Sequence, residues 1–89
     1  MALMGCNTPS ERFRGIEPVR VTVSPSTFDV RRRDADVELI RVTPEPVFTL
    51  RALAPRAIEA ARIATGCRLI PESLVGEATL MFGVLDCDH

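Results

Sequence analysis

Apolar and polar residues alternate along the first half of the chain in three runs. The alternation covers residues 19–23 and 27–31, with Ser24-Pro25-Ser26 between them, and it starts again over residues 37–42. A period of two is typical of a half-buried β-strand, and a proline breaks such a run. Residues 33–36 carry three charges and predict a turn, so the second and third runs are expected to form a hairpin.

The second half of the chain begins with a helical pattern. Thr43-Pro44-Glu45-Pro46 ends the sheet segment, because proline cannot donate to a strand ladder and disfavours a helix before it. Residues 47–50 fit either an edge strand or the approach to a helix. Pro55 suits the first position of a helix, and Gly66 suits its end. Small apolar residues recur at helical spacing between them, which predicts a helix over residues 55–65.

Two of the expected strands carry apolar residues on both faces. Ile40 breaks the alternation of its run, which indicates a bulge or a strand buried on both sides. The last strand, residues 78–86, has Leu80, Phe82 and Val84 on one face and Met81 and Leu85 on the other. Such a strand is expected to be central, with the helix on one face. Either the N-terminal strands or a partner subunit would cover the second face.

These patterns predict an α+β fold. We expect a small antiparallel sheet of about four to five strands, with one helix packed on one face and the element order β-β-β-α-β-β. The 89 residues suffice for one domain, which we place at residues 17–89. Residues 1–16 show no sustained period and are expected to form a flexible N-terminal tether.

The charge balance argues against nucleic acid as a partner. The chain has 11 basic and 12 acidic residues and a formal net charge of -1. Proteins that bind nucleic acid usually show a clear basic excess, because phosphate contacts dominate their affinity. No stretch approaches the ~18 apolar residues that cross a membrane as a helix.

The first six residues contain a short motif that ends in Cys6. Leu3-Met4-Gly5-Cys6 resembles the lipobox of bacterial lipoproteins, in which the cysteine receives the lipid. The resemblance covers four positions and implies a lipid anchor on Cys6 as the chain's only contact with the membrane. Neither a basic region nor an apolar stretch of the usual length precedes the motif, so export would require a leader upstream of Met1.

Cys67 and Cys87 are placed to meet in a second hairpin. A turn centred near Glu77 brings Cys67 opposite Cys87 and Leu69 opposite Leu85. Directly opposed residues in an antiparallel pair have Cα atoms about 4.5–5.5 Å apart, within reach of a disulfide. Pro71 disturbs this simple register, because it cannot donate to the ladder. The alternative is a pair of free buried thiols in a cytosolic core.

Catalytic and metal-binding patterns are not found in the sequence. The single histidine, His89, is the last residue, and the carboxylate pairs Asp34/Asp36 and Asp86/Asp88 are ordinary residues for turns and strand ends. The cysteine spacing does not fit a zinc site. We therefore expect neither an enzyme nor a cofactor or metal.

The consecutive arginines Arg31, Arg32 and Arg33 form the one local cluster of a single charge. Three guanidinium groups near a hairpin tip could bind an anion, such as a phosphate, a lipid headgroup or an acidic protein. Flanking aspartates would weaken that field, and a solvated turn explains the run equally well. All the basic residues are arginine, which either an anion-binding surface or the codon usage of a GC-rich genome would explain.

Taken together, the sequence predicts a non-catalytic module of the cell envelope that binds another protein, in the periplasm or anchored by lipid at the membrane. The disulfide and the lipobox support each other, since disulfides persist in oxidising compartments. Association into homo-oligomers is left open. The alternative is a cytosolic binding or regulatory domain that uses Arg31–Arg33 for an anionic ligand.

Overall fold

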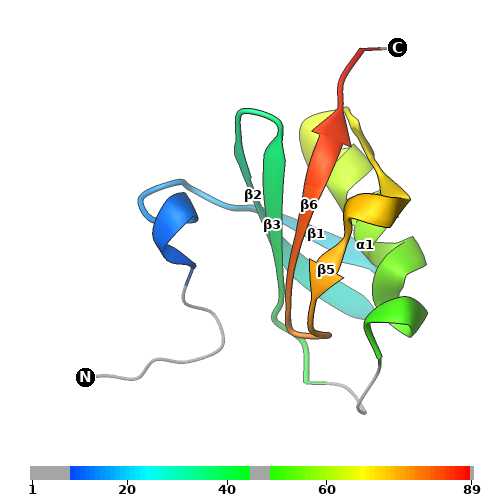
Figure 1. The fold of residues 1–89 in the computed structure, drawn as a ribbon. Coiled ribbons are helices and arrows are strands. Elements are labelled where there is room, and N and C mark those ends of the chain that lie inside the picture. The colour runs from blue at the N-terminus through cyan, green and yellow to red at the C-terminus, as the bar shows by residue number, and fades with distance from the viewer. Residues whose placement is uncertain (1–8, 45–48, 89) are drawn as a thin grey trace.

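Within residues 9–44 and 49–88, six strands form one antiparallel sheet, and a single α-helix lies along one face of it (Figure 1). The structure is a computed structural model that describes residues 9–44 and 49–88. Its elements, in chain order, are η1 (Glu11–Phe13), β1 (Val19–Val23), β2 (Ser26–Arg33), β3 (Asp36–Arg41), α1 (Leu50–Thr65), β4 (Arg68–Leu69), η2 (Pro71–Ser73), β5 (Val75–Gly76) and β6 (Leu80–Asp86). The strands lie in the order β1-β2-β3-β6-β4, and β5 also pairs with β6. The predicted α+β fold is confirmed.

Two consecutive hairpins build the first half of the sheet. β1 pairs with β2 so that Val21 faces Phe28, and β2 pairs with β3 so that Val30 faces Leu39. The second hairpin turns at Asp34, whose φ of 56° lies in the left-handed region that aspartate tolerates better than most residues. The turn that the sequence placed at residues 33–36 is confirmed.

The core lies between α1 and the facing side of the sheet. Its buried members come from every main element: Val21, Phe28, Val30, Val37, Leu39, Ala57, Ala60, Ala61, Cys67, Leu69, Met81 and Leu85. The three alanines allow the helix to approach the strands closely, because their side chains end at Cβ. We call this side of the sheet the helix face and the opposite side the outer face.

The helix begins five residues earlier than the sequence predicted, at Leu50 instead of Pro55. Thr49 is its N-cap, and the Thr49 hydroxyl accepts a hydrogen bond from the Ala52 N–H at 3.1 Å. Pro55 lies inside the helix and cannot donate to the carbonyl of Arg51, but Arg51 is exposed, so water can hydrogen-bond to that carbonyl instead. The end of the helix agrees with the prediction, since Gly66 has a φ of 78° and caps it.

The edge beside β6 is formed by β4 and β5 with an interruption between them. Leu69 pairs with Leu85 and Gly76 pairs with Met81. The chain advances seven residues from Leu69 to Gly76, whereas β6 advances only four residues between the two partners. The surplus equals the three residues of η2, which begins at Pro71. The proline that disturbed the expected register therefore starts a short 3₁₀ helix that leaves the ladder.

A disulfide between Cys67 and Cys87 closes the hairpin that the sequence predicts in the second half of the chain. The Cα atoms are 4.6 Å apart, as expected for two residues that oppose each other across antiparallel strands. The bond closes a loop with a sequence separation of 20 residues. A constraint of this length stabilises a small domain by about 3 kcal/mol through the entropy of the unfolded chain.

The N-terminal segment differs from the predicted tether. Residues 1–8 are outside the described part of the chain, but residues 9–16 pack on the outer face of the sheet, opposite α1 (Figure 1). Phe13 is only 2% exposed, and its ring lies 6.2 Å from that of Phe82. The folded part of the chain thus begins before residue 17, because Phe13 gains a buried site on the sheet.

The Phe13 contact predicts a measurable loss of stability. Phe13→Ala should lower the free energy of unfolding by about 3 kcal/mol, because it removes a buried aromatic side chain and leaves a cavity. Urea denaturation followed by circular dichroism measures the change. Glu11→Ala, in the same short helix but exposed, should change stability by less than about 0.5 kcal/mol. Equal effects of the two variants would contradict the packing of Phe13.

Candidate functional site

The three arginines of the predicted anion site do not converge. Successive residues of a strand point to opposite faces, so Arg31 and Arg33 project from the outer face and Arg32 projects from the helix face. Arg31 is 9% exposed and pairs with Glu38. Arg32 reaches the disulfide instead, with Nη2 3.4 Å from Cys87 Sγ. The three guanidinium groups therefore form no common anion site.

Glu38 is a carboxylate with no exposed surface in the middle of β3. Its Oε2 accepts a hydrogen bond from the Ser10 N–H at 2.8 Å, and its Oε1 lies 3.6 Å from Arg31 Nη1. Arg31 in turn donates through Nε to the carbonyl of Ile16 at 2.8 Å. Both ends of the N-terminal segment are thus tied to this buried ion pair.

The buried position of Glu38 and its pairing with a positive charge could be predicted from the sequence. Residues 37–41 are all buried, which confirms a strand covered on both faces at the irregularity of Ile40. The one acidic residue inside such a strand must be paired, because an isolated buried charge is very unfavourable. Arg31 is its cross-strand neighbour. The buried pair therefore follows from the register of the hairpin, which could be predicted from the sequence.

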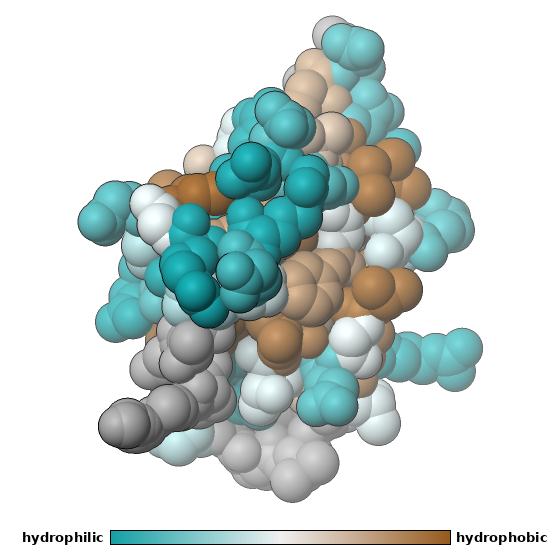
Figure 2. Space-filling view, turned by 60° about the vertical axis from the view of Figure 1, so that its left-hand side comes forward, coloured by the Kyte–Doolittle hydropathy of each residue, from teal (hydrophilic) through white to brown (hydrophobic). Residues whose placement is uncertain are grey.

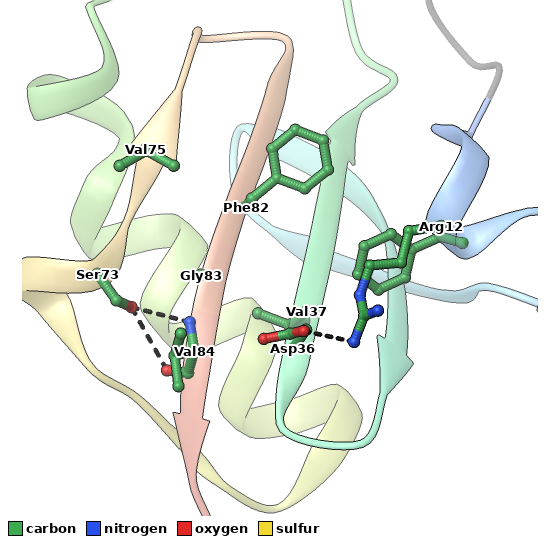
Figure 3. A pocket seen from close by; sticks show the side chains of 9 residues that line it. Arg12, Asp36, Val37, Ser73, Val75, Phe82, Gly83 and Val84 are labelled. Carbon is green, nitrogen blue, oxygen red and sulfur yellow. Dashed lines mark hydrogen bonds and ion pairs between the residues drawn. The ribbon is translucent and has the colours of Figure 1, made fainter.

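An apolar groove lies on the outer face beside the N-terminal segment. It has a volume of about 240 Å³ and is lined by Arg12, Phe13, Asp36, Val37, Ser73, Val75, Phe82, Gly83 and Val84. Figure 3 shows Val75 and Ser73 on one side of β6 and the Arg12–Asp36 pair on the other, with Phe82 between them. On the surface, brown apolar atoms gather next to a strongly hydrophilic area (Figure 2). The groove is the part of the outer face that the N-terminal segment leaves open.

Polar contacts fix both walls of the groove. Arg12 Nη2 donates to Asp36 Oδ2 at 2.6 Å, which holds η1 against the end of β3. On the opposite wall, the Ser73 hydroxyl accepts from the Val84 N–H at 2.8 Å and donates to the Ile70 carbonyl at 2.6 Å. The Ser73 side chain thereby provides a hydrogen-bond acceptor for the backbone N–H of Val84 at the point where η2 interrupts the edge of the sheet. The apolar side chains between these walls are exposed, with Val75 at 57% and Val84 at 39%.

Several carboxylates of the described chain are held by arginine. Besides Glu38 and Asp36, Asp29 receives two bonds from Arg20, at 2.7 and 3.0 Å. At the helix surface, the hydrogen bond from Arg62 lowers the pKa of Glu59 below its ordinary value. The lowered pKa keeps Glu59 charged and makes it poorly suited to proton transfer at neutral pH.

The fold and the groove define a small α+β domain with an open apolar groove on the outer face of its sheet. Comparisons of the chain with protein families, with curated proteins and with solved structures found no match. Within residues 9–44 and 49–88, no helix has the length and apolar character needed to cross a membrane. In the same residues, no three side chains of His, Cys, Asp or Glu gather as a metal site. Cys6, the predicted lipid site, lies outside them.

The buried pair of Arg31 and Glu38 makes a prediction about stability. Glu38→Ala should lower the free energy of unfolding by about 3–5 kcal/mol, because Arg31 then lies buried without its partner. The double variant Arg31→Met/Glu38→Leu removes both charges and keeps the volume, so it should be within about 1–2 kcal/mol of the natural chain. Urea denaturation of the three proteins tests this. A double variant as unstable as the single one would contradict the ion pair.

Proposed function

We propose that the protein is a non-catalytic, protein-binding module of the bacterial cell envelope, anchored at the membrane through a lipid on Cys6. The observation that carries the binding role is the groove on the outer face. Val75 and Val84 remain exposed there beside Phe82, at 57% and 39%, and line the same hollow. Apolar surface that a small domain keeps open at a defined hollow is typical of an interaction site.

The size and walls of the groove favour a side chain of another protein as the occupant. Its volume of about 240 Å³ is below the range of roughly 300–1,000 Å³ found for small-molecule pockets. It is large enough for one bulky aliphatic or aromatic side chain. Protein interfaces often seat such an anchor in an apolar pocket with a polar rim. The exposed Arg12–Asp36 pair supplies that rim and can bond to polar groups of the partner's backbone.

The envelope location is supported by two independent features. The Cys67–Cys87 disulfide is characteristic of chains that work in an oxidising compartment. Cys6 carries the lipobox resemblance, and only Asn7 and Thr8 separate it from Pro9, where the described chain begins. The three Cα–Cα steps from Cys6 to Pro9 span about 10 Å at full extension. A lipid on Cys6 would therefore hold the folded domain directly at the membrane surface.

The groove is tested by charge substitution at one of its exposed valines. Val75→Glu should abolish capture of the partner from envelope extracts, because a carboxylate cannot enter an apolar pocket without loss of solvation. Val19→Glu is the matched control, since Val19 is also an exposed strand valine, at 49%, and does not line the groove. Quantitative mass spectrometry of the captured proteins gives the readout. A partner retained by Val75→Glu, or lost equally from both variants, would refute the groove as the binding site.

The lipid anchor is tested in the native cell with the upstream sequence intact. The natural chain should be recovered with membranes and carry the mass of a lipid on Cys6, whereas Cys6→Ser should leave the membrane fraction. Cys67 and Cys87 should resist alkylation until a reductant is added. An unmodified Cys6 together with free thiols at both other positions would contradict the envelope role and favour a cytosolic domain.

A further inference from the structure

The guanidinium group of Arg32 lies against both sulfurs of the disulfide. Nη2 donates to Cys87 Sγ at 3.4 Å and Nη1 donates to Cys67 Sγ at 3.7 Å. A third bond, from Nε to the carbonyl of Asp34 at 2.8 Å, holds the group in this orientation. No carboxylate pairs with Arg32 among the residues that the structure describes, so its charge acts on the sulfurs without a competing ion pair.

The two sulfurs differ in access. Cys67 is 5% exposed and belongs to the core, whereas Cys87 is exposed just after the end of β6. The hollow of about 440 Å³ nearby is lined by Cys67 and not by Cys87, so access to Cys87 follows from its own exposure to solvent. A thiol from solution can therefore reach Cys87, while Cys67 remains shielded by the helix and the sheet.

We propose that Cys67–Cys87 is a thiol–disulfide exchange site in which Arg32 stabilises the sulfur that leaves. A thiolate of a dithiol reductant attacks Cys87 Sγ and forms a mixed disulfide with it. The bond to Cys67 breaks, and its electron pair remains on Cys67 Sγ as a thiolate. The Cys67 thiolate then accepts a charge-assisted hydrogen bond from Arg32 Nη1–H, which is stronger than the hydrogen bond to a neutral sulfur.

The second thiolate of the reductant completes the exchange. It attacks the reductant's own sulfur in the mixed disulfide, closes the reductant's disulfide and releases Cys87 as a thiolate. Two electrons pass to the protein, and the protons that the reductant's thiols lose balance those that the cysteines take up. Exchange is fastest when the leaving thiolate is well stabilised, and a neighbouring arginine provides that stabilisation. The site is separate from the groove and does not depend on its occupant.

Neutralising Arg32 tests the proposal, and the strand supplies a matched control. Arg32→Gln should slow reduction by dithiothreitol at pH 7 by about three- to tenfold. Arg33→Gln removes the same charge from the next residue, which faces the other side of the sheet, and should remain within about twofold of the natural chain. Timed acid quenching, alkylation and mass counting of the free thiols give the rates. Equal rates for the two variants would overturn the role of Arg32.

A second pair of measurements separates exchange from a merely structural effect. Brief treatment with reduced glutathione should leave its adduct on Cys87, and an adduct on Cys67 would overturn the proposed direction of attack. In the reduced protein, alkylation should reach half its maximal rate at a lower pH in the natural chain than in Arg32→Gln. Identical pH profiles, or a reduced protein that circular dichroism shows to be unfolded, would reject the site.

Discussion

A carboxylate without exposed surface, Glu38, lies in the middle of the sheet and sets the arrangement of the outer face. Burying this charge requires an opposite charge and hydrogen-bond donors close by, because solvation by bulk water is lost. The cross-strand Arg31 supplies the charge, and the Ser10 N–H supplies a donor at 2.8 Å. The N-terminal segment is therefore part of the domain, since it provides contacts that the sheet alone cannot.

The same arrangement defines the surface that remains open. η1 brings Phe13 over the sheet and stops beside Phe82, and the Arg12–Asp36 bond fixes it there. On the other side, η2 lifts the chain out of the edge and turns Ser73 toward Val84. The groove exists because two short 3₁₀ helices flank a strip of β6 that neither of them covers. Its width thus depends on the buried pair that holds the N-terminal segment in position.

The features that depend on neighbours in the chain could be predicted from the sequence. Alternation gave the strands and the first hairpin, Gly66 gave the end of the helix, and distance from a turn paired Cys67 with Cys87. The short helix η1 could not be predicted, because three residues with one phenylalanine show no period, and Phe13 is buried by strands distant in sequence. For the same reason, the run of arginines could not be assigned from the sequence to either an anion site or a solvated turn. Residues adjacent in a strand point to opposite faces, so Arg31 and Arg32 enter different environments.

The interrupted edge also limits how copies of this domain can associate. Among the strands described, β1 forms one border of the sheet with five residues, whereas the other border consists of β4 and β5 with two residues each and η2 between them. Only β1 is long enough to accept an added strand. Two copies that joined through β1 under twofold symmetry would each use their single usable border. Edge-to-edge growth through the described strands would then terminate at a pair of copies.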